Sequence, residues 1–392
     1  MKYDFETLLS RKGMGSAKWD AMLQNDIKVS DGIVPLSVAD MEFKNAPEIV
    51  EGLKQYLDKM VLGYTQATDS YYQAVINWMK NRFEYHVEKE WISETSGVIS
   101  ALNILVNSLT QKGDGILIMR PVYYPFTRVI EMHGRKVVAT ELINDNGNYT
   151  IDFDDFENKA ADENTKMLIL CSPHNPIGRV WSKAELEKVA EICLKHNVFI
   201  ISDEIHNDLI MPPFKHTVLA TLSDEVADNC AICTAPSKTF NLAGMQISNI
   251  IIKNEKYRKK FRDYREKNSE MFRNALSYKA CEIAYTQCES WLEQLITKIQ
   301  ENRDIVLDFF KENFPEFKVS PLQGTYLMWI DFTSLNIDHL ELEKRMTNSA
   351  QVFLDEGYIF GDSGKGFERI NIACPSDVLI KALERIKKEF KS

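Results

Sequence analysis

The sequence predicts an α/β fold, with a mostly parallel sheet in a large helix-covered domain and a smaller α+β domain. Two observations predict this fold. Between about residues 94 and 252, short apolar runs alternate with helical stretches, which is the pattern of βα units. After about residue 289 the pattern changes, and a chain of 392 residues is longer than a single hydrophobic core usually supports.

The first region contains five apolar runs that read as strands. They are short and apolar on both faces, as expected for a parallel sheet buried between helices. A helix is predicted over residues 183–196, because Ser182 and Glu185 form the pattern of a capping box at its start. The predicted strands are residues 116–119, 167–171, 198–202, 230–234 and 247–252.

The last hundred residues predict an α+β module. A long helix over residues 289–313 ends near Pro315, and a strand-like segment follows at residues 325–332. We then expect a helix that runs to about Glu356, a glycine-rich loop, a strand at residues 368–373 and a final amphipathic helix. The expected domains are therefore a large one over residues 46–288 and a small one formed by residues 1–45 and 289–392.

Composition limits the possible partners and compartments. The net charge of −10 argues against nucleic acid or an anionic membrane as a partner. No apolar run approaches the roughly 20 residues that a membrane helix needs, and the N-terminus lacks the apolar stretch of a secretory signal. Seven cysteines without framework spacing are typical of a reduced cytoplasmic protein. No metal-binding motif is present, so no metal is expected.

A lysine and an aspartate follow the ends of two neighbouring predicted strands. Lys238 comes four residues after the run 230–234, and Asp203 ends the apolar run before it. Ligands of open α/β sheets bind at such strand ends. An amine can bind the aldehyde of pyridoxal 5′-phosphate (PLP), and a carboxylate can keep the ring nitrogen of PLP protonated. Each residue also has an ordinary reading, because Lys238 could be a surface lysine and Asp203 a loop acid.

Three further segments could complete a PLP site. Asn175 lies in a rigid turn after the predicted strand 167–171, where its amide can donate to a phenolic oxygen. Gly97 opens an amphipathic helix whose N-terminus could bind a phosphate. Tyr123 and Tyr124 could stack on a ring or move protons. Each of these segments alone could equally be a plain turn, an ordinary helix start or two core aromatics.

An arginine in the predicted small domain suits a substrate carboxylate. The guanidinium of Arg369 can bind both oxygens of a carboxylate in a bidentate manner. Glu368 should point to the opposite face of the strand and therefore need not neutralise Arg369. A structural salt bridge elsewhere in the protein is the alternative role for this arginine.

The ordered set of these residues resembles the fold-type I PLP-dependent enzymes of the aminotransferase superfamily. Aminotransferases usually carry a serine three residues before the lysine, an arginine eight residues after it, and a tyrosine three after the aspartate. Here those positions hold Ala235, Gln246 and His206. These departures are similar to the MalY/PatB-type cystathionine β-lyases, including cysteine desulfhydrases of the cystalysin type. The segments that match this family are 18–20 (KWD), 35–43 (PLSVADMEF), 172–181 (SPHNPIGRVW) and 236–244 (PSKTFNLAG).

The resemblance implies a role for each candidate residue. Lys238 would bind the cofactor and move the α-proton, Arg369 would hold the substrate carboxylate, and Tyr123 would protonate the departing thiolate. Tyr64 would reach the PLP phosphate of a neighbouring subunit, which implies a homodimer with active sites at the interface. His206 would lie at the cofactor without an assigned role. The other cofactor-binding residues would be Asp203 on the ring nitrogen, Tyr124 stacked on the ring, Asn175 at the 3-hydroxyl group, and Gly97, Val98 and Ser237 on the phosphate.

The activity implied by the resemblance is α,β-elimination on sulfur amino acids. L-cystathionine, L-cysteine or related S-substituted cysteines would give pyruvate, ammonia and a thiol or sulfide. Two alternatives remain open at this point. The chain could be an aminotransferase on the same fold, or a protein of the MalY type with an added regulatory binding role.

Overall fold

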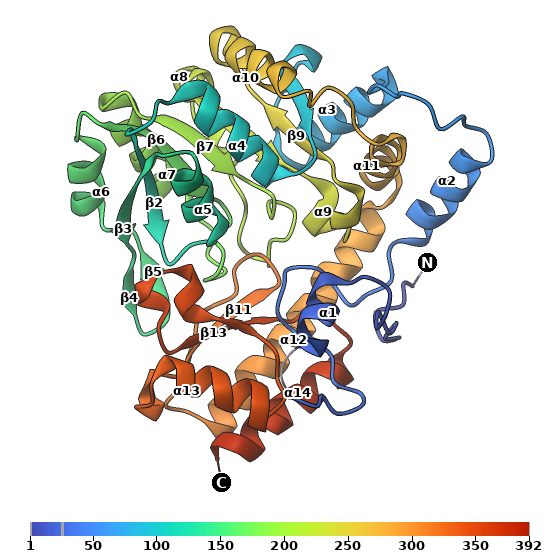
Figure 1. The fold of residues 1–392 in the computed structure, drawn as a ribbon, viewed down its shortest axis with the longest axis vertical. Coiled ribbons are helices and arrows are strands. Elements are labelled where there is room, and N and C mark those ends of the chain that lie inside the picture. Colours follow the sequence, from blue (N-terminus) through green and yellow to red (C-terminus); the bar gives the residue numbers. More distant parts are fainter. Residues whose placement is uncertain (1, 25–26, 392) are drawn as a thin grey trace.

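The computed structural model describes residues 2–24 and 27–391. The chain builds two main sheets (Figure 1), a large one covered by helices and a smaller one that carries the C-terminal helices. This arrangement confirms the predicted α/β fold with its additional α+β part. The domain limits at residues 45 and 288 remain a prediction.

The large sheet has seven strands, and among the described strands only β9 runs opposite to the others. β9 pairs antiparallel with both of its neighbours, β1 and β8, whereas the other neighbouring strands pair in parallel. The sheet is therefore mostly parallel, as predicted. In spatial order the strands are β1 (Ile92–Thr95), β9 (Ser248–Ile251), β8 (Cys230–Thr234), β7 (Phe199–Asp203), β6 (Thr165–Cys171), β2 (Gly115–Arg120) and β3 (Lys136–Glu141).

Helices cover both faces of this sheet because alternate strand residues point to opposite sides. Ile201 and Ile169 pack with the helices of one face, whereas Ile200 and Leu168 belong to the core on the other face. The first face is covered by α4 (Val98–Leu109), α5 (Pro125–Met132) and α10 (Glu255–Lys267), and the second by α6 (Phe153–Ala160) and α7 (Lys183–Lys195). The predicted capping box of α7 is present.

The smaller sheet is antiparallel and has the order β10–β11–β13–β12. The expected helix to Glu356 is wrong, because α13 ends at Lys344 and a π-helical turn at Arg345–Ser349 follows it. Asp355 and Glu356 instead form an edge strand, opposite Arg369 and Glu368. The strands are β10 (Lys318–Val319), β11 (Leu327–Asp331), β13 (Phe367–Asn371) and β12 (Asp355–Glu356), and the helices are α12 (Glu289–Asn313), α13 (His339–Lys344) and α14 (Ser376–Phe390).

The segment of residues 36–42 connects the two sheets. Its Leu36 exchanges backbone hydrogen bonds with the second sheet region, accepting from Asn371 and donating to Phe353. On its other side, Met41 exchanges two hydrogen bonds with the side chain of Asn241, which follows Lys238 closely in the chain. The remaining elements are α1 (Ala17–Leu23), α2 (Pro47–Leu57), α3 (Asp69–Phe83), the hairpin of β4 (Ile143–Asp145) and β5 (Asn148–Thr150), α8 (Asp224–Asp228), α9 (Pro236–Thr239) and α11 (Ala275–Gln287).

Within the described ranges, no helix combines the length and the apolar character needed to span a membrane.

Candidate active site

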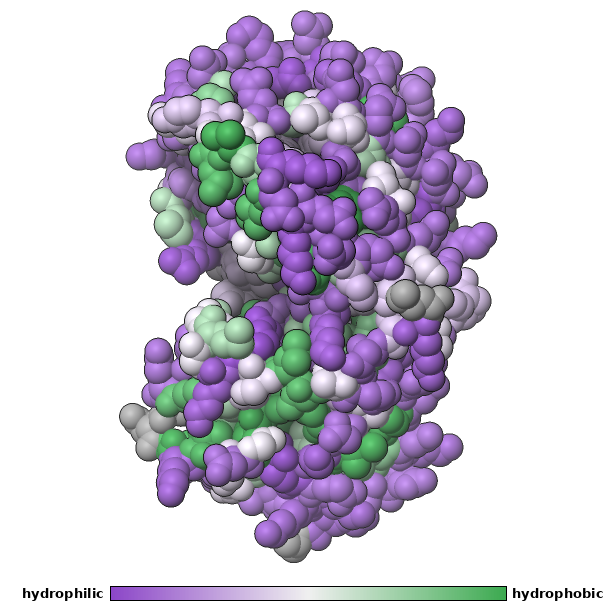
Figure 2. Space-filling view, turned by 90° about the vertical axis from the view of Figure 1, so that its right-hand side faces the viewer, coloured by the Kyte–Doolittle hydropathy of each residue, from purple (hydrophilic) through white to green (hydrophobic). Residues whose placement is uncertain are grey.

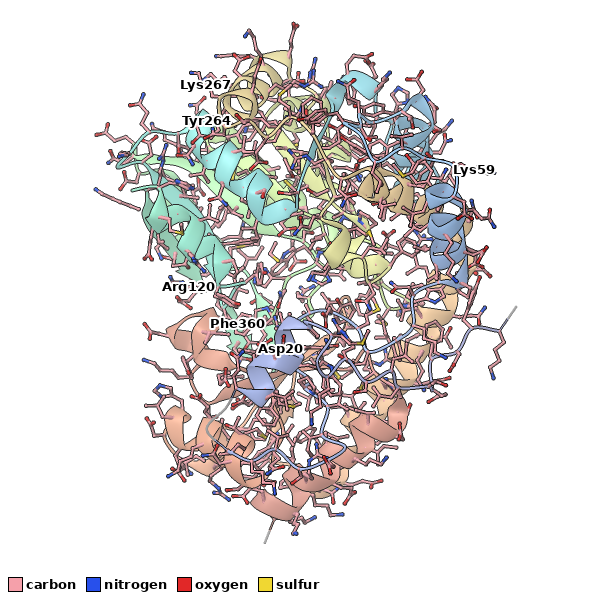
Figure 3. The ribbon with its side chains drawn as sticks, turned by 45° about the vertical axis from the view of Figure 1, so that its right-hand side comes forward. Asp20, Lys59, Arg120, Tyr264, Lys267 and Phe360 are labelled. Carbon is pink, nitrogen blue, oxygen red and sulfur yellow. The ribbon has the colours of Figure 1, made fainter. Side chains whose placement is uncertain are left out.

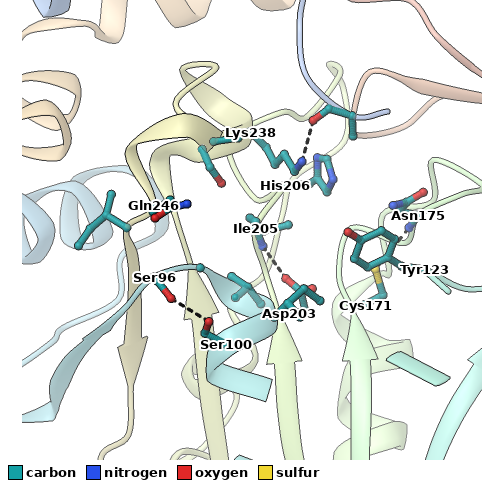
Figure 4. A pocket seen from close by; sticks show the side chains of 17 residues that line it. Ser96, Ser100, Tyr123, Cys171, Asn175, Asp203, Ile205, His206, Lys238 and Gln246 are labelled. Atoms are coloured by element: carbon teal, nitrogen blue, oxygen red, sulfur yellow. Dashed lines mark hydrogen bonds between the residues drawn. The ribbon is translucent and has the colours of Figure 1, made fainter. Parts of the chain in front are cut away.

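A cavity of about 270 Å³ opens at the carboxyl ends of the central strands. It lies where β6 and β7 end, beside the N-terminus of α4 and the short helix α9 (Figure 4). Most of the predicted site residues meet here, although they come from segments that are far apart in the sequence. The predicted residues in its lining are Gly97, Val98, Tyr123, Asn175, Asp203, His206, Ser237 and Lys238.

Lys238 projects into this cavity from α9, directly after β8. Its Nζ donates a hydrogen bond of 2.6 Å to the backbone carbonyl of Ala39. The next residue, Thr239, donates to the buried carboxylate of Asp208 at 2.9 Å, which fixes the helix that carries the lysine. Burial lowers the pKa of Lys238 to about 8, and the guanidinium of Arg369 also lowers it. The lysine therefore has a much larger neutral fraction than an ordinary lysine, as a nucleophile or a base requires.

Asp203 ends β7 at the floor of the cavity. Its carboxylate accepts a hydrogen bond of 3.2 Å from the backbone N–H of Ile205. Burial raises the pKa of Asp203 to about 7, although this hydrogen bond and the nearby Lys238 both act to lower it. A buried carboxylate with so little compensation is suited to a cationic partner.

Asn175 and Arg369 bind each other at one wall of the cavity. The Oδ1 atom of Asn175 accepts from Nη1 of Arg369 at 2.9 Å, so the amide NH₂ group of Asn175 is left to donate elsewhere. Nη2 of Arg369 is ion-paired with Asp355, and its buried Nε has no hydrogen-bond partner among the described residues. Arg369 thus lies behind the described cavity lining and already holds a carboxylate. Glu368 does point away from it, as expected from strand alternation.

The two adjacent tyrosines differ in position. Tyr123 lines the cavity beside Asn175 (Figure 4), and burial raises the pKa of its phenol well above the usual value. Tyr124 is 44% exposed and lines a separate groove with Phe360 and Arg120, at the boundary between the two sheets (Figure 3). The described cavity lining therefore does not include Tyr124, which we expected to stack on the ring. Tyr124 is the N-cap residue of α5, which starts at Pro125.

The N-terminus of α4 closes another side of the cavity. The helix has 12 residues, and its first N–H groups lack partners within the helix. A Cβ atom at Gly97 would meet no described atom within 4 Å, so there is open space in front of this helix end. The hydroxyls of Ser96 and Ser100 lie 2.8 Å apart there, and Ser237 lines the same cavity. This arrangement can bind a phosphate through N–H groups, hydroxyls and the helix dipole.

His206 also lines the cavity, next to Lys238. Burial and the positive charges of Lys238 and Arg369 hold the pKa of His206 well below its usual range, so its imidazole is neutral. Its ring packs against Tyr326 in a T-shaped arrangement at 5.9 Å. In the described part of the chain its Nδ1 atom has no hydrogen-bond partner.

Tyr64 does not meet the other site residues within one chain. It lies between α2 and α3, is 95% exposed and contacts the ring of Phe272 at 5.4 Å. Its predicted role depends on a second subunit and stays a prediction.

The prediction from sequence missed the carbonyl of Ala39. This oxygen accepts hydrogen bonds from both Lys238 and Tyr326. Ala39 belongs to the segment PLSVADMEF, so a signal was present, but an alanine side chain does not indicate a functional backbone group.

The sequence matches the family described as aminotransferase class I and II over residues 31–386. The chain therefore belongs to this family.

Within the family, the chain is similar to carbon–sulfur lyases. It is 40% identical over 384 residues to cystathionine beta-lyase PatB of Bacillus subtilis, covering 98% of this chain and 99% of PatB. It is 30% identical over 383 residues to protein MalY of Escherichia coli, covering 97% of each. The crystal structure of cystalysin from Treponema denticola, which contains PLP, matches it with a TM-score of 0.98 and 51% identity, covering 100% of this chain and 99% of cystalysin. These similarities confirm the resemblance to the MalY/PatB type.

Proposed function

We propose that this protein is a PLP-dependent carbon–sulfur β-lyase that cleaves L-cystathionine, L-cysteine or related S-substituted cysteines. The observation that carries the proposal is the meeting of Lys238 and Asp203 in one buried cavity, within a chain similar to PatB over almost its full length. The products would be pyruvate, ammonia and a thiol or sulfide. The proposal includes PLP as the cofactor.

The residues of the cavity fit PLP by their chemistry. The buried amine of Lys238 can bind the aldehyde. The carboxylate of Asp203 is buried with few groups to stabilise its charge, and it therefore suits a protonated ring nitrogen. The open N-terminus of α4 suits the phosphate. When bound, PLP supplies an electron sink that stabilises negative charge on the α-carbon of the substrate.

The protein's own groups would then position the substrate and move its protons. The neutral Nζ of Lys238 would take the α-proton of the amino acid, while Asp203 holds the proton on the ring nitrogen. Because Oδ1 of Asn175 is occupied by Arg369, the amide of Asn175 would donate to the 3-hydroxyl oxygen. The unpartnered Nε of Arg369, together with its Nη atoms, would bind the substrate carboxylate.

The positions of the two tyrosines favour an exchange of their expected roles. Tyr123 lies in the cavity beside Asn175 and is therefore the better candidate to stack on the ring. Tyr124, which lies towards the groove with Phe360, is then available to protonate the sulfur that leaves. Both phenols come from the same turn, with ring centroids 5.6 Å apart, so one of them can serve the ring while the other serves the leaving group.

The proposed active unit is a homodimer. Val61 and Leu62 are mostly exposed beside Tyr64, and Phe272 packs against this loop while half of its own surface stays exposed. Figure 2, which views the side that carries α2, shows apolar surface between polar areas. Exposed apolar groups gathered in one region favour a protein contact. In a dimer, Tyr64 could contribute its phenol to the partner's phosphate site.

A substrate assay tests the proposed function. The purified protein, supplied with PLP, is incubated with L-cystathionine or L-cysteine, and pyruvate and thiol are measured without any added keto acid. We expect both products in equal amounts. In a parallel incubation with an added keto acid, transfer of the amino group without release of pyruvate from the substrate would instead identify an aminotransferase and overturn the proposal.

A further inference from the structure

The carbonyl oxygen of Ala39 connects the reactive lysine to the N-terminal part of the chain. It accepts a hydrogen bond of 2.6 Å from Nζ of Lys238 and one of 2.9 Å from the hydroxyl of Tyr326. All three residues are buried or face the cavity. Since the contact is made by backbone, the position of this oxygen depends on what fixes residues 39–42 rather than on the side chain of Ala39.

Lys18 is the centre of the contacts that fix these residues. Its Nζ lies 2.9 Å from Oδ1 of Asp40 and 2.8 Å from Oε1 of Glu42, and it donates to the backbone carbonyl of Asp40 at 2.9 Å. An ammonium group has three donors, so these three acceptors satisfy it completely. The side chains of Lys18 and Glu42 are each 1% exposed.

Arg11 completes this cluster from the outer side. It binds both carboxylate oxygens of Asp40, at 3.1 and 2.9 Å, and reaches Glu42 at 3.2 Å. The indole N–H of Trp19 also donates to Glu42. Two cations thus balance two carboxylates, with Lys18 and Glu42 closed to water and Arg11 and Asp40 partly exposed. Figure 3 shows α1, marked by Asp20, at the level where the two parts of the molecule meet.

We propose that this charge cluster, formed by Arg11, Lys18, Asp40 and Glu42, holds the Ala39 carbonyl against the amine of Lys238 and thereby positions the catalytic lysine. Its members are positioning residues that touch neither the substrate nor PLP. The inference rests on the role of Lys238 in the proposed function. Buried ion pairs add little stability compared with apolar side chains. The cluster is therefore better explained by its effect on the backbone of residues 39–42, which it holds in place, than by a gain in stability.

The cluster also acts on Lys238 through its charges. Asp40 raises the pKa of Lys238, whereas Lys18 lowers it. Burial acts to raise the pKa of Asp40, but the bonds from Arg11 and Lys18 outweigh burial and keep this carboxylate ionised. Removal of Lys18 should therefore shift the pKa of Lys238 in one direction, and removal of Asp40 should shift it in the other. A general loosening of the structure would not be expected to shift this pKa in opposite directions in the two variants. Among the described residues, the other charged or titratable groups around Lys238 include Asp203, His206, Tyr123, Tyr326 and Arg369.

The test uses the PLP-loaded protein and follows the visible absorbance of the lysine-bound cofactor against pH. We expect Lys18→Met to raise the midpoint of this titration and Asp40→Asn to lower it. The charge-balanced double variant Lys18→Met with Asp40→Asn should return the midpoint towards that of the wild type. Because all three variants misplace the Ala39 carbonyl, we expect kcat to fall by roughly tenfold to a hundredfold in each, including the double variant.

A surface lysine of the same region provides the matched control. Lys44 pairs with Asp4, and both side chains are more than 40% exposed, so Lys44→Met removes one positive charge nearby without touching the cluster. Its midpoint and kcat should equal those of the wild type.

Unchanged midpoints, or shifts of the same sign in both single variants, would overturn the inference. If Lys18→Met does not fold, Asp40→Asn and the double variant still decide, because a wild-type midpoint in Asp40→Asn contradicts the proposed coupling on its own. Failure of the proposed function would look different. In that case the wild type itself would release no pyruvate from the sulfur amino acids, whatever the midpoints of the variants.

Discussion

Burial of Lys238 should make the apoprotein react with PLP at a far lower pH than an ordinary lysine would. The pKa of Lys238 is about 8, compared with 10.5 for an unperturbed lysine. At pH 7 about one amine in ten is then neutral, instead of about one in three thousand. This is a gain of roughly 300-fold in the reactive form, equivalent to about 3 kcal/mol.

The assay is stopped-flow mixing of apoprotein with PLP at a series of pH values, followed by visible absorbance. Because only the neutral amine attacks the aldehyde, the rate should rise tenfold per pH unit below pH 8 and level off above it. Lys238→Ala is the blank, and a short lysine peptide gives the unperturbed profile. A rate for the protein that follows the profile of the peptide would refute the reasoning that burial lowers the pKa.

The remaining predictions concern substrate, ring and phosphate. Arg369→Ala should lower kcat/KM by roughly 10- to 100-fold, the value of a charge-assisted hydrogen bond, with PLP still bound; unchanged kcat/KM would count against the carboxylate contact. Tyr123→Ala should weaken PLP binding about two- to tenfold through lost stacking, while Tyr124→Ala leaves the affinity for PLP unchanged. If Tyr124→Ala instead weakened PLP binding and Tyr123→Ala did not, Tyr124 would be the residue that stacks on the ring. Tyr64→Phe should weaken PLP binding several-fold by removing one hydrogen bond, and equal Kd values in equilibrium dialysis would contradict the contact across the dimer.

Strand ends were the most predictable feature of the site. Lys238, Asp203 and Asn175 follow apolar runs that could be recognised from composition alone, and parallel strands bring their carboxyl ends to one edge. The edge strand β3 was missed, because most of its residues are partly or fully exposed and it lacks a continuous apolar run. The helix expected to reach Glu356 failed for a related reason. Asp355 and Glu356 pair with a strand that is distant in sequence, and local propensity does not contain that pairing.

Details within the cavity depended on geometry that residue types do not encode. Of the two neighbouring tyrosines, Tyr123 is part of the described cavity lining and Tyr124, the N-cap of α5, is not. The ion pair between Arg369 and Asp355 depends on the register of β12 against β13. The acceptor for Lys238 is a backbone oxygen, which every residue type could supply.

The position of residues 36–42 has a mechanical consequence. Asn371 of β13 donates to the carbonyls of Val38 and Asp40, and Asn241 binds the backbone of Met41. A hinge movement of one sheet against the other must therefore strain these bonds or draw the Ala39 oxygen away from Lys238. The orientation of the Lys238 amine therefore depends on the angle between the two halves of the molecule. A movement of the domains would change the reactivity of the lysine at the same time.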